Sequence, residues 1–215
     1  MKAYFFLLVL LALMSSCNNS SKTSKSFCDT ACNNDTIKYE LADHPERPRL
    51  KISVKNCVAD TLTWYHTAMP ASRQIQLGGF FDQQLRLNSK AINCFINDTS
   101  NIWLTFNDCV NGRGYLVMLP FDKKGDIKKS TAALNNFDPK FSVSSDMRAY
   151  AIKSGMYAVN VKTGKEEFMT FKEEYDIDWN NIHSIIDSVN VTPQRMYTKL
   201  LKNGKEIVFE KKIAL

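Results

Sequence analysis

The chain has 215 residues, of which 28 are Lys or Arg and 22 are Asp or Glu, and its formal net charge is +6. The basic residues are spread along the chain, and the densest runs are pairs such as Lys123-Lys124, Lys128-Lys129 and Lys211-Lys212. Such pairs are typical of a solvated surface, so we exclude nucleic acid as a partner. A chain of this length forms one domain, or at most two, around a substantial core.

The first residues have the pattern of an export signal. Lys2 precedes an unbroken apolar run from Ala3 to Met14, which is too short to cross a bilayer as a stable helix, and Ser15-Ser16-Cys17 follows. We therefore predict a signal peptide over residues 1–16. No later apolar stretch approaches spanning length, so we expect a protein that does not cross the membrane.

The segment Met14-Ser-Ser-Cys17 resembles the lipobox of bacterial lipoproteins. That resemblance implies that Cys17 becomes the first residue and carries acyl chains such as palmitate, which anchor the protein to a membrane. The alternative is an ordinary secretory signal in which the cysteine is a coincidence. Residues 17–48 are predicted to be a polar tether and cysteine-containing segment, and residues 49–215 a β-repeat domain.

The same resemblance bears on location. Some Bacteroidota lipoproteins carry an acidic run after the cysteine that sends them to the cell surface, whereas this tether has Lys22 and Lys25 and no acid before Cys28. We therefore expect a lipid-anchored protein of the bacterial cell envelope, on the outer membrane and facing the periplasm. The lipobox, the Asn/Ser tether and the segment from Cys28 to Thr36 together resemble the small lipoproteins of Bacteroidota.

Five cysteines follow Cys17: Cys28, Cys32, Cys57, Cys94 and Cys109. An oxidising compartment favours disulfides, and an odd number leaves at least one thiol free or paired between chains. Cys28 and Cys32 have a spacing that can bind Cu(I), but no proline follows and no βαβ pattern surrounds them. A structural disulfide is the alternative, and we expect no cofactor.

From about Leu50 onward, short alternating apolar runs predict half-buried strands, as in Leu50–Val54 and Met156–Val161. Gly125, Gly164 and Gly204 lie about 40 residues apart, and each ends a predicted hairpin that opens on a tyrosine. These tyrosines are Tyr115, Tyr157 and Tyr197. A repeat of about 40 residues built from short strands is typical of propeller blades.

The segment from Asp138 to Lys165 resembles the WD40-like repeat of TolB-type β-propellers. It matches the motif at Asp138, Pro139, Phe141, Ser142, Ala149, Tyr150, Gly164 and Lys165, but Val143-Ser144-Ser145 replaces the usual Pro-Asp-Gly turn. The resemblance implies an all-β fold of antiparallel four-stranded units in a propeller-like arrangement. A β-sandwich or open sheet with evenly spaced hairpins is the alternative.

One segment departs from the β pattern. Ile182, Ile185, Ile186 and Val189 lie at helical spacing after a possible cap at Asp178–Asn180. We predict one short helix over residues 180–188, with its apolar stripe in the core.

The sequence offers few residues for catalysis. His44, His66 and His183 belong to no known catalytic or zinc motif. Glu173, Glu174, Asp176 and Asp178 form an acidic cluster without calcium-loop spacing, so a solvated turn is the simplest interpretation. The loop Asn111–Gly114 could wrap an anion, with Arg113 as donor, although a hairpin connection explains it equally well.

A short motif recurs more often than composition predicts. Exported proteins of Bacteroidota are glycosylated at Asp-Ser/Thr followed by an apolar residue or Thr. This pattern makes four residues candidates for O-glycosylation: Thr30, Thr36, Thr61 and Ser188.

These observations favour a non-catalytic envelope lipoprotein whose β-repeat domain binds another protein. The first alternative is an envelope enzyme that acts on glycan or peptide through His66 or the cluster from Glu173 to Asp178. The second is a redox or copper-handling protein that uses Cys28 and Cys32. Fold class alone does not decide between them.

Overall fold

The computed structural model describes residues 35–215. The predicted signal peptide, Cys17, Cys28, Cys32 and Thr30 lie outside this range. The described chain is mostly β-structure, as the sequence predicted, and its strands form four small sheets. Within residues 35–215, no helix is long and apolar enough to cross a membrane.

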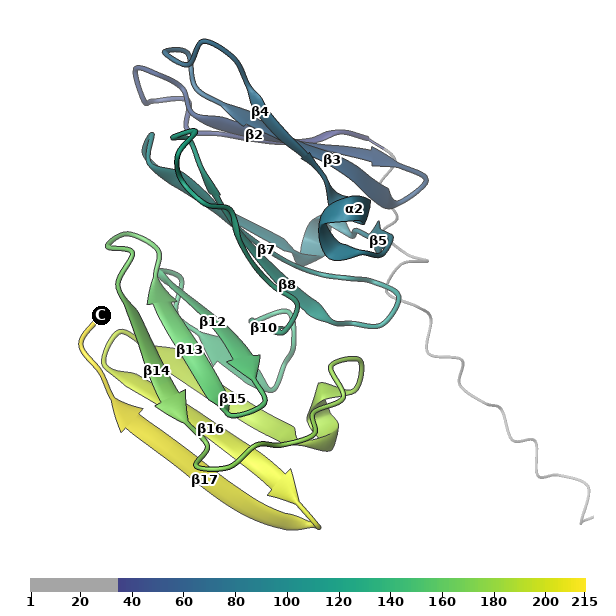
Figure 1. The fold of residues 1–215 in the computed structure, drawn as a ribbon, viewed down its shortest axis with the longest axis vertical. Coiled ribbons are helices and arrows are strands. Elements are labelled where there is room, and N and C mark those ends of the chain that lie inside the picture. Colours follow the sequence, from purple (N-terminus) through teal and green to yellow (C-terminus); the bar gives the residue numbers. More distant parts are fainter. Residues whose placement is uncertain (1–34) are drawn as a thin grey trace, which may run out of the picture.

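Two sheets form the N-terminal half of the fold (Figure 1). Sheet 1 contains β1 (Ile37–Glu40), β2 (Arg49–Lys55), β3 (Val58–Tyr65), β4 (Arg73–Gln76) and the short β5 (Leu85–Arg86), which pairs with β3. Sheet 2 contains β6 (Ile92–Asn97), β7 (Asn101–Asn107), β8 (Gly114–Pro120) and β9 (Lys128–Ser130). The helix α2 (Leu77–Phe81) and the 3₁₀ turn η1 (Ser89–Ala91) lie between them in the chain.

The other two sheets form the C-terminal half. Sheet 3 contains β10 (Ala133–Leu134), β12 (Met147–Ile152), β13 (Gly155–Asn160) and β14 (Glu166–Thr170). Sheet 4 contains β11 (Phe141–Val143), β15 (Ile186–Thr192), β16 (Arg195–Lys202) and β17 (Lys205–Lys212). All pairings are antiparallel except that of β11 with β15, which is parallel.

The repeat of about 40 residues corresponds to these units. Tyr115 and Tyr157 lie on the third strands of sheets 2 and 3, and Tyr197 on the third strand of sheet 4. The turn before each fourth strand contains the predicted glycine. Asn203 and Gly204 both have positive φ, at 52° and 74°, as an Asn-Gly hairpin turn requires.

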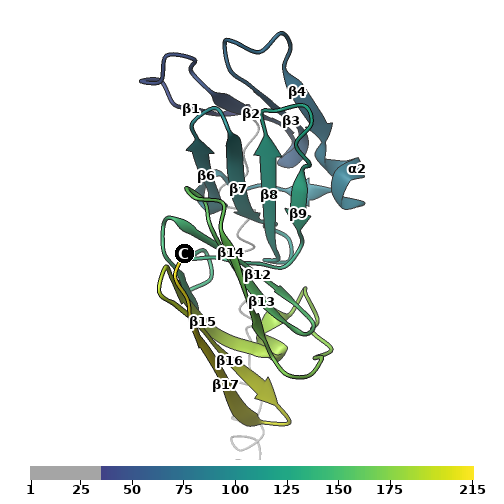
Figure 2. The ribbon, with the colours of Figure 1, turned by 60° about the vertical axis from the view of Figure 1, so that its left-hand side comes forward.

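The four sheets are stacked face to face in one row, with sheets 2 and 3 in the middle (Figures 1 and 2). Alternation along β7 explains how a middle sheet is buried on both faces. Ile102, Leu104 and Phe106 face the core shared with sheet 1, whereas Trp103 belongs to a separate cluster that faces sheet 3. The near-continuous apolar sequence of β7 and β8 is therefore the pattern of a strand covered on both sides.

The two end sheets have polar outer faces. On sheet 1 this face pairs Lys51 with Thr63 across β2 and β3. On sheet 4 Lys199 forms ion pairs with Asp187 at 2.8 Å and Glu206 at 2.9 Å. Such faces are solvated and do not stack on one another, so the row is open. The propeller-like arrangement is not confirmed, and the open-sheet alternative fits the structure.

Two predicted boundaries need correction. Helical structure within residues 180–188 is limited to the 3₁₀ helix η2, which spans Ile182–Ser184, and β15 begins at Ile186. The buried residues Ile186, Val189 and Val191 lie on β15. Their β-branched side chains favour a strand and pack against sheet 3. The fold also begins before residue 49, since β1 pairs with β2 from Ile37 onward.

Two cysteines of the N-terminal half form disulfides. Cys57 and Cys109 are each disulfide-bonded. Both lie beside β5, because the Leu87 amide donates to the Cys57 carbonyl and the Cys109 amide donates to the Arg86 carbonyl, each at 2.9 Å. A disulfide at either position restricts the unfolded chain and thereby stabilises the fold. Cys94 is free, in line with the odd number of cysteines.

Gly114 provides a test of the packing between sheets 2 and 3. A Cβ atom at this position would lie 2.1 Å from the carbonyl oxygen of Ala133, so β8 and β10 approach too closely for any side chain. We expect Gly114→Ala to lower the free energy of unfolding by about 3 kcal/mol or more.

The matched control is Gly79→Ala in α2, where an added Cβ meets nothing within 4 Å. This variant should be as stable as the parent or up to about 1 kcal/mol more stable, because alanine favours a helix. Denaturant unfolding measures both changes. Equal unfolding midpoints for the two variants would contradict the close contact of β8 with β10.

Candidate functional site

The hollows in the surface gather where sheets 2 and 3 meet. Three of them adjoin one another along the segment Lys128–Ala133, and we call this run the junction groove. Its first hollow has a volume of about 190 Å³ and lies between the β7–β8 loop and η2. The middle hollow, of about 450 Å³, shares Ala132 and Trp179 with the first. The third is a small hollow of about 30 Å³, which shares Lys129, Ser130 and Tyr150 with the middle one.

Asparagine side chains frame the first hollow. Asn135 donates from Nδ2 to Oδ1 of Asn107 at 2.6 Å, and Asn107 donates to the carbonyl of Gly112 at 3.1 Å. Asn111 donates to Oδ1 of Asn180 at 3.4 Å. These bonds fix the β7–β8 loop against the β10–β11 connection and η2. The hollow therefore has a preformed polar wall rich in groups that both donate and accept hydrogen bonds.

The loop Asn111–Gly114 lies at this hollow, but Arg113 does not act as a free anion donor. Its Nε donates to the carbonyl of Thr131 at 2.5 Å, and its Nη2 donates to the hydroxyl of the same residue at 2.7 Å. The guanidinium also lies 5.8 Å from the centre of the Tyr115 ring. Arg113 thus ties the β7–β8 loop to the β9–β10 connection.

His183 also lines the first hollow. Its Nε2 lies 2.6 Å from Oδ2 of Asp138, and its Nδ1 lies 3.0 Å from the carbonyl oxygen of Ile186. Both ring nitrogens are engaged by oxygen atoms of the protein. Neither is directed at a reacting group, so the geometry gives His183 a structural role: it holds the β10–β11 connection against the start of β15.

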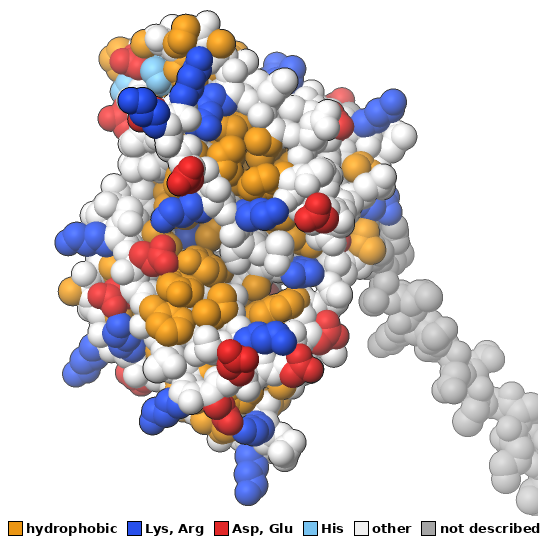
Figure 3. Space-filling view, in the orientation of Figure 1, with side chains coloured by type: hydrophobic (Ala, Val, Ile, Leu, Met, Phe, Trp, Pro, Cys, Tyr) orange, Lys and Arg blue, Asp and Glu red, His pale blue; other side chains and the backbone are white. Residues whose placement is uncertain are grey.

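An aromatic ladder forms the wall of sheet 3 near the other end of the groove. Tyr150, Tyr157 and Phe168 are direct neighbours across β12, β13 and β14. The rings of Tyr150 and Tyr157 stack with centres 4.9 Å apart, and those of Tyr157 and Phe168 lie 4.6 Å apart. All three side chains are half-buried. Figure 3 shows hydrophobic side chains gathered over β13 and β14 on this face, with charged side chains around them.

The carboxylate of Glu166 lies at the edge of the aromatic ladder. The Tyr150 hydroxyl donates to Oε1 of Glu166 at 3.1 Å. Burial, together with the nearby carboxylate, raises the pKa of Tyr150 well above its usual value. Tyr150 therefore stays neutral at any physiological pH and serves as a contact surface.

The other predicted catalytic groups are not brought together. His66 lies next to sheet 1, with Nδ1 2.7 Å from Oε2 of Glu46, and His44 Nε2 lies 2.5 Å from Oδ1 of Asp98. Glu173 follows β14 of sheet 3 and binds Lys202, which lowers the pKa of the carboxyl. His66 and the acidic cluster thus belong to different halves of the fold.

Two further carboxylates of the acidic cluster have contacts of their own. Asp176 lies 3.5 Å from Nζ of Lys153, and Asp178 accepts a hydrogen bond from the Asn180 amide at 3.0 Å. These contacts are with a lysine and a backbone amide, whereas glycoside hydrolysis uses two carboxyl groups that flank one bond of the substrate. Within the described residues, no group of three or more His, Cys, Asp or Glu side chains could hold a metal ion.

The candidate glycosylation sites differ in their surroundings. Thr36 is exposed just before β1, and its neighbour Thr30 lies outside the described range. Thr61 is half-buried in β3 and donates to Oδ2 of Asp60 at 2.8 Å. Ser188 is half-buried in β15, beside a bulge in the pairing with β16.

Sequence reasoning named the loop Asn111–Gly114 and His183, which line the first hollow, but it did not find the aromatic residues of the groove. Trp179 was noted only as part of a helix cap, and Tyr150 only as part of the repeat motif. Phe168 carried no signal, because its place in the ladder depends on the β13–β14 register. A search for aromatic residues at equivalent positions of neighbouring strands would have identified the ladder once that register was known.

Cys94, on β6, allows a test of burial in sheet 2, where its side chain packs against the core shared with sheet 1. Burial raises the pKa of its thiol to about 12, since a thiolate would be poorly solvated there. At pH 8 the fraction in the reactive thiolate form is then lower than for an exposed thiol by about three orders of magnitude. We expect iodoacetamide to alkylate Cys94 about a thousandfold more slowly in the folded protein than in guanidinium.

Peptide mapping of the alkylated protein separates Cys94 from the other cysteines. Cys57 and Cys109 serve as internal controls that should remain unmodified without a reductant. Equal rates of Cys94 modification in the folded and unfolded protein would contradict the buried thiol.

No protein-family model matches this chain, and a search of curated proteins finds no significant match.

Proposed function

We propose that this chain is a lipid-anchored protein of the bacterial envelope that binds a segment of another envelope protein in the junction groove, without chemical turnover. The observation that carries this proposal is a half-exposed aromatic ladder of Tyr150, Tyr157 and Phe168 near one end of a groove whose other end is a preformed polar hollow. Aromatic side chains and well-placed amides are typical of recognition surfaces.

The chemistry of the groove suits a polypeptide. The ladder offers apolar contact area at one end, and the asparagine wall offers donors and acceptors that match peptide groups at the other. Lys129 and Lys153 line the hollow between them, and the Lys153 side chain is 56% exposed. We therefore expect an extended segment that carries apolar side chains and at least one acidic residue.

The engagement of the titratable groups supports binding rather than catalysis. A general base or nucleophile needs an atom directed at the substrate, whereas both nitrogens of His183 are held by Asp138 and Ile186. The carboxylates of Glu173 and Asp176 face lysines. The groove thus contains contact groups without a poised acid–base pair.

The predicted anchor at Cys17 fits this role. About 20 residues separate Cys17 from the start of β1 at Ile37. A segment of that length spans at most about 70 Å, which allows the sheets to stand clear of the membrane surface. The partner would then be a protein in the periplasm or in the same membrane.

Site-specific photo-cross-linking tests the proposal. A photoreactive residue replaces Lys153 in the groove, or Lys51 on the outer face of sheet 1 as a control, in the lipidated protein in native membranes. We expect one protein to cross-link from position 153 and not from position 51. Adding Tyr157→Ala should reduce the cross-link about tenfold, because a central aromatic contact is lost.

The outcomes separate the alternatives. The same cross-linked protein from both positions, or none from position 153 in folded and lipidated protein, would contradict groove binding. Loss of the cross-link when soluble envelope glycan is added before irradiation would instead indicate a carbohydrate ligand. A separate Cys17→Ala variant tests the anchor alone, because it should move the protein to the soluble fraction.

A further inference from the structure

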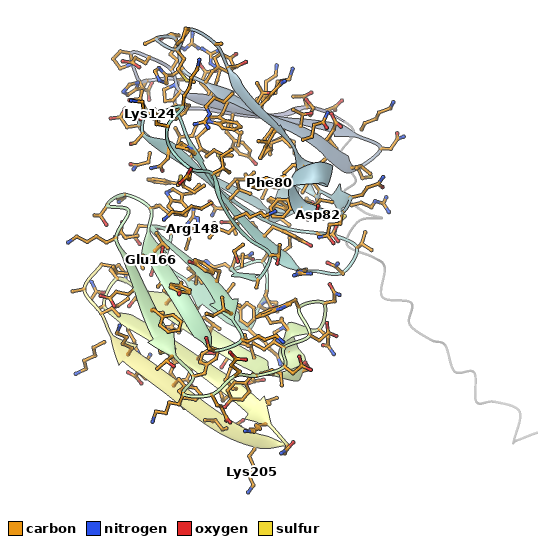
Figure 4. The ribbon with its side chains drawn as sticks, viewed as in Figure 1. Phe80, Asp82, Lys124, Arg148, Glu166 and Lys205 are labelled. Carbon is orange, nitrogen blue, oxygen red and sulfur yellow. The ribbon has the colours of Figure 1, made fainter. Side chains whose placement is uncertain are left out.

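A fourth hollow, of about 100 Å³, lies between sheets 2 and 3 on the other side of Asn135 from the junction groove. Its lining includes Arg148 from β12, and Asn93 and Thr105 from sheet 2. Arg148 is 5% exposed and Thr105 is 3% exposed. Figure 4 labels Arg148 in the layer between the two sheets.

The guanidinium of Arg148 is only partly satisfied by the protein. Its Nη1 donates to the carbonyls of Ser145 at 3.0 Å and Met147 at 2.7 Å, and its Nη2 donates to Oδ1 of Asn93 at 3.0 Å. These contacts use three of its five N–H groups. Among residues 35–215, no partner accepts a hydrogen bond from Nε.

The charge of Arg148 also lacks a close counterion. In the described part of the chain, the arginines that form ion pairs are Arg47, Arg49 and Arg195. No carboxylate there lies within 4.0 Å of the Arg148 guanidinium, although Asp146 is near enough to favour the charged form. The neighbouring Cys94 thiol is neutral, since its pKa is raised. Desolvation lowers the pKa of Arg148, but arginine keeps its charge in proteins. A buried cation without a counterion is costly unless an anion joins it.

Thr105 also lines this hollow, and its side chain supplies a second unsatisfied group. Its hydroxyl is buried and has no hydrogen-bond partner within the described chain. A hydroxyl can donate to an anion, and a guanidinium edge with Nε and Nη2 donates to two oxygens of one planar group. By contrast, Asn136 at the hollow's rim is satisfied by both backbone groups of Val143. The buried donors at this hollow that lack a partner within the described chain therefore belong to Arg148 and Thr105.

We infer that this hollow is a binding site for a small oxyanion, with Arg148 as its charged donor and Thr105 as its hydroxyl donor. The shared chemistry is that of a carboxylate or an inorganic phosphate. A volume of about 100 Å³ holds a group of acetate or phosphate size, since one water occupies about 30 Å³ in the liquid. A carboxylate suits the planar edge of the guanidinium best. The site is separate from the junction groove and does not depend on the function proposed for it.

Titration of the full chain with sodium acetate and with sodium phosphate tests this inference, at constant ionic strength set with sodium chloride. Calorimetry measures affinity, and the Nε–Hε NMR signal of Arg148 reports the location. We expect saturable binding of at least one anion, with a shift of that signal. Saturation by acetate alone identifies a carboxylate site, by phosphate alone a phosphate site, and by both a general oxyanion site.

Three variants locate the binding. Arg148→Lys keeps the charge and loses the planar fork, so affinity should fall at least tenfold. Thr105→Val should weaken binding about three- to tenfold without destabilising the protein, because the hydroxyl has no protein partner to lose. Arg195→Lys, on the outer face of sheet 4, is the control and should bind as the parent does.

Thr105→Val keeps the test decisive if Arg148→Lys does not fold. Absence of saturable binding for both anions would overturn the inference. Binding that is unchanged in Thr105→Val, or that leaves the Arg148 signal unmoved, would also overturn it, since the anion would then bind elsewhere.

Discussion

The rest of the structure depends on the burial of both faces of sheets 2 and 3. Alternate residues of β7 and β8 pack against two different neighbouring sheets, and the apolar contact is larger on one face than on the other. Ile102, Leu104 and Phe106 contribute to a large apolar core with sheet 1. The opposite face meets sheet 3 through a much smaller cluster that includes Trp103 and Val159. A second large core joins sheets 3 and 4. The molecule is thus two two-sheet sandwiches joined at a junction with little apolar burial.

That inequality determines where polar groups and hollows occur. Apolar burial supplies most of the folding free energy, so the two large cores stabilise each half and leave the junction free to contain Thr105, Asn135 and Arg148. The groove, the aromatic ladder and the Arg148 hollow all lie along this junction. A surface that needs no large apolar contact for stability can expose aromatic and amide groups to a ligand. The proposed binding role rests on this difference: the two large cores stabilise the fold, and the junction presents the contact groups.

The parts of the fold that depend on local signals were predictable from the sequence. Asn203 and Gly204 form the predicted turn because both accept positive φ, and the repeat identified the third strand and last turn of three units. The isoleucines near residue 185 led to a wrong helix boundary, because their spacing fits both an apolar helical stripe and the start of a strand. The sequence did not show whether the row of sheets closes into a ring, because that depends on which faces of the two end sheets are polar. It also did not show the groove, because the ladder of Tyr150, Tyr157 and Phe168 depends on the register between strands.

Native-state hydrogen exchange across a denaturant series tests the central claim most directly, because it measures whether the two sandwiches open independently. The small junction predicts two cooperative units: the strands of sheets 1 and 2 should exchange with one free energy and denaturant dependence, and those of sheets 3 and 4 with another. β7 belongs to sheet 2 and β13 to sheet 3, on opposite sides of the junction. The amides of these two strands should therefore belong to different cooperative units. Exchange of all strands through one global opening would contradict the account, because it would show that the junction couples the halves as strongly as a continuous core does.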